Sequence, residues 1–387
     1  MRKINLFFII TKLELGGAQK HLLSLILFLE KSKYNIFLFT AKEGLLVNDA
    51  LSLGGITLIK SEFLERPVNF INDLLAFGEI CSFIKKNNID IVHTHGSKAG
   101  ILGRFAAKCT GVKVLLHTVH GWSFNDYQNF FLRRLFIWLE RLCARFSDRI
   151  IVVCEYDKRK GLAKRIGTCS KYCIIHYGID YREFSRKDIN LRRELGLDNH
   201  DLVVGMVACF KPQKSPLDFI EAARRVTKIL PQARFLLIGD GVLRKDIEAQ
   251  IIKSGLAKNV MLTGWRRDIS GILSSLDVFV LTSLWEGVPI SVLEAMAASK
   301  PVVVTNTGGI TEVITDGVNG YLVSAKNAIL LSERIIALLV DVKLRERMGE
   351  NARRSLDNRF SLENMVRNTS ALYEAILNGK GAGKNAQ

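Results

Sequence analysis

Residues 286–294 read Glu-Gly-Val-Pro-Ile-Ser-Val-Leu-Glu, with seven residues between two carboxylates. Residues 277–283 upstream are apolar and β-branched, which predicts a buried strand. Residues 292–298 downstream are rich in helix formers. A strand, a turn and a helix start in succession form a place where backbone N–H groups can face an anion. Two carboxylates beside that anion can bind hydroxyl groups, and a sugar joined to a nucleotide diphosphate carries both kinds of group.

The composition predicts a folded chain of two domains. It has 387 residues, 48% of them hydrophobic, which excludes wholesale disorder. No apolar run approaches the ~20 residues that cross a bilayer. Residues 1–10 are basic and then apolar, like a short signal peptide, but they lack a small-residue cleavage site, so we interpret them as a first buried strand. Seven scattered cysteines without a zinc pattern indicate reduced thiols in a cytoplasmic protein.

Positive charge is concentrated in the first half of the chain. The net charge is +17, and residues 1–183 carry +11 of it. This excess favours an anionic partner for the first half, such as a membrane surface or a lipid diphosphate. A basic surface that only aids solubility is the alternative. The basic residues are dispersed and no nucleic-acid motif accompanies them, so we expect no nucleic-acid partner.

Strands and helices alternate in both halves of the chain. Expected strands are 4–10, 35–40, 56–58, 89–93, 113–119, 149–153, 202–209, 234–238, 260–263, 278–281 and 302–305. Expected helices are 18–29, 70–87, 98–109, 128–146, 216–229, 243–253, 269–275, 290–298, 329–339 and 362–377. This rhythm predicts an α/β protein with two doubly wound parallel sheets, joined through the charged, turn-rich residues 178–200. Residues 379–387 have the composition of a disordered tail.

The stretch 286–294 resembles the paired-glutamate motif of family 4 glycosyltransferases, which are retaining enzymes of the GT-B fold, and the resemblance covers nearly the whole chain. It implies two Rossmann-like domains facing a cleft. Residues 1–183 would bind the acceptor and residues 184–360 the nucleotide sugar, while a helix over 361–378 would return to the first domain. The resemblance also implies a UDP- or GDP-linked sugar as donor substrate, with no metal and no other cofactor.

The resemblance assigns roles at successive strand ends. Glu294 would hold the ribose, Glu286 the transferred sugar, and Lys214 with nearby backbone N–H groups the departing diphosphate. Cys209 stands where the family usually has an arginine, and Lys211 is expected to supply the missing charge. The donor-binding set is Gly16, Gly17, Lys211, Lys214, Gly239, Gly264, Gly287, Val288, Pro289, Ile290, Ser291 and Glu294.

Gly16 and Gly17 follow the first strand and open the first helix, where glycines let a backbone approach a diphosphate. The spaced dinucleotide fingerprint is absent. A plain strand–helix turn is the alternative.

Histidines end two neighbouring strands of the first half. His120 matches the family histidine that contacts the donor sugar, and with Glu286 it forms the expected catalytic pair. His95 is a candidate for the acceptor site. His93 and His95 could bind metal in principle, but the sequence offers no evident third ligand, so no metal site is expected.

The expected helix 128–146 has an apolar face and a face of arginines interleaved with aromatic residues. Such a pattern suits a lipid interface, where phosphates meet acyl chains. A core helix with one wet side is the alternative. The residues expected at the acceptor or the membrane are His95, Arg134, Trp138, Arg141 and Arg145.

These features predict a retaining hexosyltransferase that acts on a lipid-linked or other saccharide acceptor in cell-surface polysaccharide synthesis. We expect it in the cytoplasm, peripheral at the inner face of the cell membrane. A nucleotide-sugar epimerase or hydrolase on the same fold is a second hypothesis. A non-catalytic GT-B binding module is a third, favoured by Cys209 alone.

Overall fold

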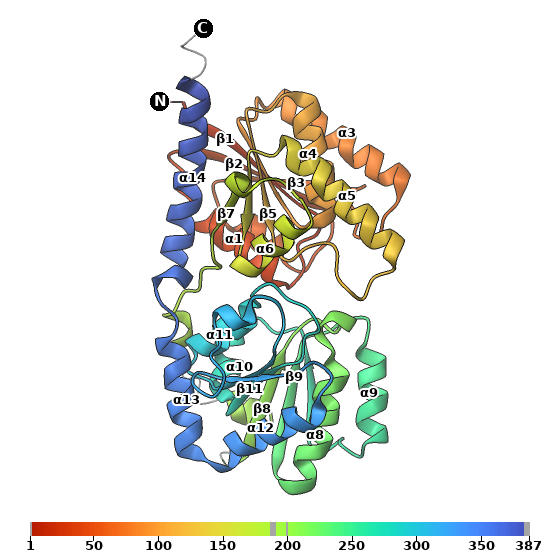
Figure 1. Ribbon diagram of the computed structural model, residues 1–387, viewed down its shortest axis with the longest axis vertical. Helices are drawn as coiled ribbons and strands as arrows, with labels where there is room; N and C mark the ends of the chain where they lie inside the picture. Colours follow the sequence, from red (N-terminus) through yellow and green to blue (C-terminus); the bar gives the residue numbers. More distant parts are fainter. Residues whose placement is uncertain (1, 186–190, 199, 383–387) are drawn as a thin grey trace. The chain divides into compact units, whose positions relative to one another are not determined.

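The computed structural model describes residues 2–185, 191–198 and 200–382 (Figure 1). The chain divides into two compact units, of which the first comprises the residues up to Gly178 together with the C-terminal helix, and the second is Ile179–Ser361. No disulfide joins any of the seven cysteines, all of which are described. Among the described helices, none has the length and apolar character needed to span a bilayer.

The first unit is a parallel sheet in the order β3-β2-β1-β4-β5-β6-β7. Its strands are β1 (Ile4–Ile10), β2 (Tyr34–Ala41), β3 (Ile56–Ser61), β4 (Ile91–His95), β5 (Val114–Val119), β6 (Arg149–Val152) and β7 (Tyr172–Ile174). Its helices are α1 (Gly17–Phe28), α2 (Val47–Ser52), α3 (Phe70–Lys86), α4 (Ser97–Thr110), α5 (Phe130–Phe146), α6 (Glu155–Ala163), the 3-10 turn η1 (Cys169–Lys171) and α14 (Leu362–Ala382).

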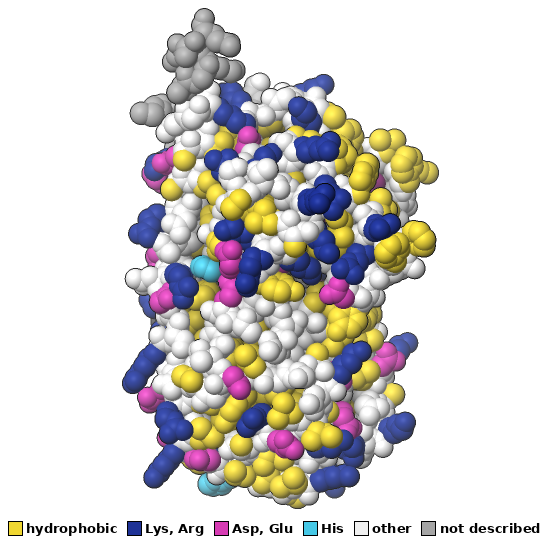
Figure 2. Space-filling model, in the orientation of Figure 1, with side chains coloured by type: hydrophobic (Ala, Val, Ile, Leu, Met, Phe, Trp, Pro, Cys, Tyr) yellow, Lys and Arg dark blue, Asp and Glu magenta, His cyan; other side chains and the backbone are white. Residues whose placement is uncertain are grey.

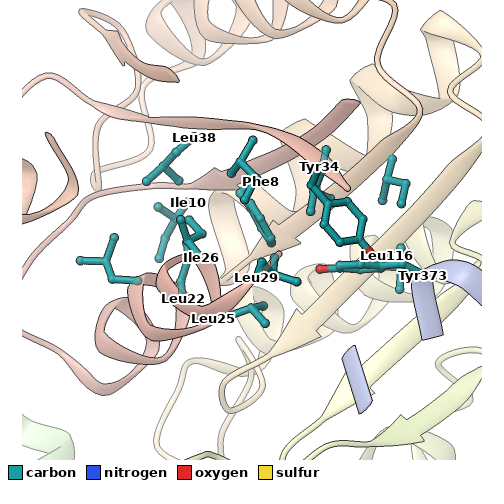
Figure 3. Packing of buried hydrophobic residues seen from close by; sticks show 14 of the residues in the cluster. Phe8, Ile10, Leu22, Leu25, Ile26, Leu29, Tyr34, Leu38, Leu116 and Tyr373 are labelled. Carbon is teal, nitrogen blue, oxygen red and sulfur yellow. The ribbon is translucent and has the colours of Figure 1, made fainter. Parts of the chain in front are cut away.

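Strand β1 is apolar on both sides because helices cover both faces of the sheet. Phe8 points into a cluster with residues of α1 and α14, which Figure 3 shows from close by. Phe7 and Ile9 point the other way, into a cluster built with α3 and α4. Side chains alternate along a strand, so a continuous apolar run is what a sheet buried on both faces requires.

Helix α14 belongs to the first unit although it is the last element of the chain. It packs against α1, and the ring of Tyr373 lies fully buried beside Tyr34 (Figure 3). The helix extends to Ala382, so residues 379–382, which their composition assigned to a disordered tail, are helical instead. Lys380 explains the extension, because its Nζ pairs with Asp148 at 2.5 Å and donates to the carbonyl of Lys113 at 2.6 Å. The rest of the predicted tail, 383–387, lies outside the described residues.

The second unit repeats the architecture with a parallel sheet in the order β10-β9-β8-β11-β12-β13. Its strands are β8 (Leu202–Val207), β9 (Ala233–Ile238), β10 (Val260–Gly264), β11 (Val278–Leu281), β12 (Val302–Thr305) and β13 (Tyr321–Val323). Its helices and 3-10 turns are η2 (Glu183–Ser185), α7 (Leu191–Glu194), η3 (Pro212–Lys214), α8 (Pro216–Ile229), α9 (Arg244–Lys253), α10 (Ile269–Ser275), α11 (Ile290–Ala297), η4 (Gly308–Glu312), α12 (Ala328–Val340), α13 (Val342–Arg354) and η5 (Asn358–Phe360).

The predicted fold class, two doubly wound Rossmann-like domains, is confirmed by these two sheets. The elements that the sequence did not reveal are α2, α6, α7, α13, β7 and β13. Strands β7 and β13 have three residues each, too few for an alternating pattern to be recognised. Helices α6 and α13 are dominated by charged residues, so their narrow buried stripes are hidden among polar positions.

Candidate active site

Each sheet reverses its strand order at one point, and ligands of open α/β sheets bind at the carboxyl ends of strands beside such a point. In the first unit the reversal lies between β1 and β4, and in the second unit it lies between β8 and β11. The segments that follow β1, β8 and β11 contain eight of the expected site residues, namely Gly16, Gly17, Lys211, Lys214, Glu286, Gly287, Val288 and Pro289.

In the second unit, Lys214 and Glu286 meet in a salt bridge at the reversal point, through Nζ and Oε1. Lys214 ends the turn after β8, and Glu286 lies in the loop after β11. Both side chains are mostly buried. Gln213 supports the loop, because its Nε2 donates to the carbonyl of Trp285 at 2.8 Å. The two residues expected to contact sugar and diphosphate separately therefore neutralise each other in this structure.

The loop that carries Glu286 is fixed by the glycine turn at η4. Gly308 has φ +63°, and a Cβ there would lie 1.9 Å from the carbonyl oxygen of Glu286. Gly309 donates its N–H to the carbonyl of Gly287 at 2.8 Å. Only glycine at position 308 allows both the left-handed backbone and this close approach. The predicted turn at 307–312 thus acts by positioning the glutamate loop.

Glu294 lies in helix α11 and is buried, with 6% of its surface exposed. Helix α11 begins at Ile290, directly after Pro289, and no described side chain caps it. The first backbone N–H groups of a helix have no partner within the helix, so this end can receive an anion. Gly287, Val288, Pro289 and Ile290 are buried and Ser291 is half-buried. The second expected carboxylate and the expected N–H donors are therefore adjacent on one short helix.

The remaining expected donor residues also lie at the carboxyl ends of the second sheet. Gly239 follows β9 with φ +132°, and a Cβ there would meet the carbonyl of Ala208 at 2.0 Å. Gly264 ends β10 and accepts a hydrogen bond from the N–H of Gly239 at 2.9 Å. Lys211 and Cys209 are half-buried in the loop after β8, where the N–H of Lys211 donates to the carbonyl of Cys209.

In the first unit, Gly16 and Gly17 connect β1 to α1. Gly16 is the N-cap residue directly before α1, where no side chain of the described residues caps the helix, and it has extended backbone, φ −141°. A Cβ at Gly16 would come within 2.6 Å of the Gln19 side chain, and Gln19 donates to the carbonyl of Lys12 at 2.9 Å. The turn is therefore a tight strand–helix connection whose helix start faces the reversal point.

His120 and His95 are joined directly. His95 ends β4 and His120 follows β5, and His95 Nδ1 lies 2.9 Å from His120 Nε2. The other ring nitrogen of His120 lies 2.9 Å from the hydroxyl of Tyr177. The rings of His120 and Tyr177 stack, 5.7 Å apart. His120 is thus held at both nitrogens, which orients the ring that the family resemblance assigns to the donor sugar.

A third histidine, His21 on α1, lies against this pair, with its ring centroid 5.2 Å from that of His120. Burial lowers the pKa of His21 to about 4. Burial, and then the neighbouring histidines, also lower the pKa values of His95 and His120 well below the usual value. All three imidazoles are therefore neutral at pH 7 and are able to accept a hydrogen bond or bind a metal.

Sequence reasoning missed His21 and Tyr177. His21 lies one helical turn after Gly17, so its place in the first turns of a helix that starts at the reversal point was a usable signal. Tyr177 gave no local signal, because it follows β7, a strand too short to predict.

Helix α5 exposes aromatic side chains to solvent. Phe131 and Trp138 are 78% and 57% exposed. The buried side holds Glu140, whose carboxylate pairs with Arg104 of α4 at 2.7 Å. Figure 2 shows apolar side chains beside Lys and Arg over α3 and α5. Helix α5 therefore buries one side, which includes Glu140, Cys143 and Ala144, and turns Phe131 and Trp138 outward.

Arg134, Arg141 and Arg145 are exposed on the same helix. The guanidinium of Arg134 lies 4.4 Å above the ring of Phe130. These arginines and aromatic residues therefore share one solvent-facing side of α5.

Two family descriptions match almost the entire chain. Residues 15–183 match "Glycosyltransferase Family 4" and residues 187–355 match "Glycosyl transferases group 1". The two matches lie one after the other, in the order of the two units.

Curated relatives carry transferase activities. The chain is 33% identical to UDP-Gal:alpha-D-GlcNAc-diphosphoundecaprenol alpha-1,3-galactosyltransferase of Escherichia coli, over 80% of this chain and 81% of that protein. It is 31% identical to N,N'-diacetylbacillosaminyl-diphospho-undecaprenol alpha-1,3-N-acetylgalactosaminyltransferase of Campylobacter jejuni, over 77% of this chain and 80% of that protein.

Solved structures agree in fold. Anabaena Alr3699/HepE in complex with UDP and glucose superposes with a TM-score of 0.83 at 20% identity, over 96% of this chain and 100% of that chain. WaaG, a glycosyltransferase involved in lipopolysaccharide biosynthesis, superposes with a TM-score of 0.78 at 18% identity, over 93% and 98%. The predicted family is therefore confirmed: the chain is a glycosyltransferase of the GT-B fold and belongs to family 4.

Proposed function

We propose that the protein is a retaining glycosyltransferase that moves a sugar from a nucleotide diphosphate sugar to a hydroxyl of a lipid-linked saccharide, in the synthesis of a cell-surface polysaccharide. The observation that carries the proposal is the pairing of Lys214 with Glu286 beside the uncapped start of α11. A cation, a carboxylate and free helical N–H groups at one sheet edge suit a diphosphate with a sugar attached.

On donor binding, the diphosphate would take Lys214 from Glu286, and the released carboxylate would accept hydrogen bonds from the sugar. The bond between the anomeric carbon and the diphosphate oxygen then breaks, while the acceptor oxygen forms its bond on the same face. The acceptor proton passes to the departing phosphate oxygen. Lys214 and the N–H groups of α11 stabilise the negative charge that grows on the diphosphate, and stabilising such charge usually accelerates a transfer reaction more than any other effect of the enzyme.

Named relatives support the donor and the acceptor. The Escherichia coli relative is named for a UDP-linked galactose and a diphosphoundecaprenol acceptor, and the Campylobacter jejuni relative is named for a diphospho-undecaprenol acceptor. We therefore propose a UDP-sugar as donor and a polyprenyl diphosphate saccharide as acceptor. The buried, neutral His120 would face the donor sugar, and we propose His95 at the acceptor side.

An exposed apolar surface with nearby arginines supports contact with the cytoplasmic face of the membrane. Phe131 and Trp138 of α5 are joined there by Phe70 of α3, which is 83% exposed. Helix α4 packs against both α3 and α5. Aromatic residues among arginines can enter the boundary between lipid headgroups and acyl chains, and the surplus charge of residues 1–183 favours anionic lipids. A peripheral enzyme docked there would meet a lipid-linked acceptor.

The donor proposal is tested by nucleotide titration followed by turnover. We expect UDP to raise the melting temperature, and the effect to weaken in Glu294→Gln but not in Glu333→Gln, an exposed glutamate of α12. At 100 times its dissociation constant a ligand adds about 2.7 kcal/mol of stability. With a UDP-sugar and a polyprenyl diphosphate saccharide we expect a product that keeps the anomeric configuration.

Release of UDP without acceptor would instead indicate a hydrolase. Binding without any turnover would indicate a non-catalytic module, and an inverted product would refute the retaining mechanism.

The membrane proposal is tested by co-sedimentation with vesicles containing phosphatidylglycerol. We expect binding to fall in Phe131→Ser/Trp138→Ser and in a variant with Arg134, Arg141 and Arg145 changed to Gln. The control is Ile252→Ser, which removes an apolar side chain of similar exposure from α9. Equal binding of all variants would refute this surface as the docking site.

A further inference from the structure

Three histidines from separate elements of the first unit converge on one point. His21 comes from α1, His95 ends β4, and His120 follows β5. One ring nitrogen from each lies within 4.8 Å of the other two. The sequence suggested only His93 and His95 as a pair, without a third ligand. His93 lies outside this cluster, and its two ring nitrogens bond to Tyr373 and Thr118.

Two nitrogens of this cluster have unused bonding capacity. His21 Nδ1 and His95 Nε2 are buried and have no hydrogen-bond partner within the described part of the protein. The two residues are 6% and 0% exposed. A buried polar atom without a partner is unfavourable, so a ligand that bonds to it recovers free energy.

We propose that His21, His95 and His120 form a binding site for a transition-metal dication of the zinc class. Zinc takes imidazole nitrogens at about 2.0–2.1 Å, so ligand atoms in a tetrahedral site lie about 3.3 Å apart. Metal binding at His120 Nε2 replaces its 2.9 Å contact with His95 Nδ1, and rotation of the side chains brings the ligand atoms, which lie within 4.8 Å of one another, to this spacing. Three protein ligands leave the fourth position to water.

The chemistry of the ligand atoms selects the class of metal ion. The cluster consists of imidazoles alone, and no carboxylate of the described residues takes part in it. Calcium and magnesium prefer oxygen ligands, whereas zinc, copper and nickel accept imidazole. Tyr177 acts as an outer partner, because its hydroxyl bonds to the second nitrogen of His120 and orients the ring.

Metal binding would inhibit transfer. An ion held by His120 removes that ring from the donor sugar and puts a positive charge into a buried position. This consequence rests on the proposed function, whereas the binding does not. The two are therefore tested by different readouts.

Binding is tested by titrating the reduced, full-length protein with Zn²⁺ in a calorimeter and with Co²⁺ by absorption. We expect one tight site and a tetrahedral Co²⁺ spectrum without a thiolate charge-transfer band, which excludes the cysteines as ligands. His21→Gln and, separately, His21→Phe should lower the affinity about 100-fold, since each removes one of three ligands. His200→Ala, at an exposed histidine of the second unit, should leave it unchanged.

The outcomes distinguish the metal site itself from its effect on transfer. Equal affinity in the wild type and both His21 variants, or a thiolate band, would overturn the site. If the variants fold differently by circular dichroism, His95→Gln replaces them in the same comparison. Tight binding without loss of transfer would leave the site intact and would remove His120 from the donor contact. Inhibition that a chelator reverses, and that is weaker in His21→Gln, would support both.

Discussion

At the scale of single residues, the Lys214–Glu286 salt bridge is the contact on which the proposed chemistry depends. Both side chains are expected to contact the substrate, yet in this structure they form a salt bridge with each other. A partly buried pair of this kind contributes little net stability, because desolvation offsets the attraction. In the proposed mechanism the pair holds both side chains close to the positions in which the donor needs them.

Removing one charge from this pair should therefore separate nucleotide binding from transfer. Glu286→Gln leaves Lys214 without its buried partner, so we expect UDP to bind more tightly, because the diphosphate no longer competes with a carboxylate for that cation. Transfer should fall by about 100-fold, the usual loss for one transition-state contact. Lys214→Met should weaken UDP binding and transfer together. Calorimetry with UDP and initial rates measure both, and weaker UDP binding in Glu286→Gln would contradict the exchange of partners.

At the scale of elements, the η4 turn and the glutamate loop are one structural unit. Gly308 and Gly317 both have positive φ, +63° and +74°. An added Cβ meets a backbone oxygen only at Gly308, and nothing described lies within 4 Å of it at Gly317. Comparing substitutions at the two glycines therefore distinguishes the effect of backbone strain from the effect of displacing the Glu286 loop.

Gly308→Ala and Gly317→Ala should differ sharply. Both introduce left-handed strain of roughly 1–2 kcal/mol, but Gly308→Ala also forces the Glu286 loop to move, at a further cost of about 1–3 kcal/mol. We expect urea unfolding to show the larger loss for Gly308→Ala, together with loss of transfer. Gly317→Ala should remain active. Similar activities would mean that the loop position does not matter for transfer.

The buried Arg104–Glu140 pair fixes helix α5 against α4. The two side chains are 0% and 2% exposed, and Arg104 Nε also donates to the carbonyl of Gly100 at 2.7 Å. Arg104 Nη1 has no hydrogen-bond partner among the described residues. An ion pair so placed sets orientation more than it adds stability.

Breaking this pair on one side should therefore cost more than replacing it. Glu140→Leu leaves a buried guanidinium alone and should destabilise the first unit by about 3–5 kcal/mol. Arg104→Met/Glu140→Leu should be more stable than the single variant, because no charge is left buried. Urea unfolding of both proteins measures the difference. A double variant that is less stable than Glu140→Leu would show that the pair contributes net stability.

At the scale of the whole molecule, the chain ends in the unit in which it began. Tyr373 of α14 bonds through its hydroxyl to His93 Nδ1 at 2.6 Å, across 280 residues of sequence. Tyr34 bonds to Ser370 of the same helix at 2.9 Å. The first unit is therefore complete only after the second has been synthesised, which makes its folding depend on contacts distant in sequence.

Tyr373→Phe should destabilise the first unit alone. The buried imidazole of His93 loses one partner, at a cost of about 1–3 kcal/mol, which lowers the melting temperature by about 2–4 °C per kcal/mol for a unit of this size. In scanning calorimetry we expect Tyr373→Phe to shift only the transition of the first unit. Tyr321→Phe, in the second unit, should leave the first unit's transition unchanged. A shift of both transitions would mean that the units unfold together.

The sequence by itself determined the two sheets, the family and the place in the fold of most of the expected donor residues. Apolar runs of strand length recur in a parallel order, and Glu286, Glu294 and Lys214 lie close to strands that are easy to recognise. Sheet edges gather such residues by a general rule, since the carboxyl ends of parallel strands meet at one edge. The local pattern was therefore sufficient for them.

Only the tertiary structure decided which side chains pair and which faces are buried. The third histidine of the cluster comes from α1, the aromatic side of α5 faces solvent because Arg104 holds Glu140 inside, and residues 379–382 are helical because Lys380 is anchored. Each depends on a contact between residues far apart in the chain. Periodicity records only which residues share a face, and the energy of a long-range contact chooses the direction in which that face points.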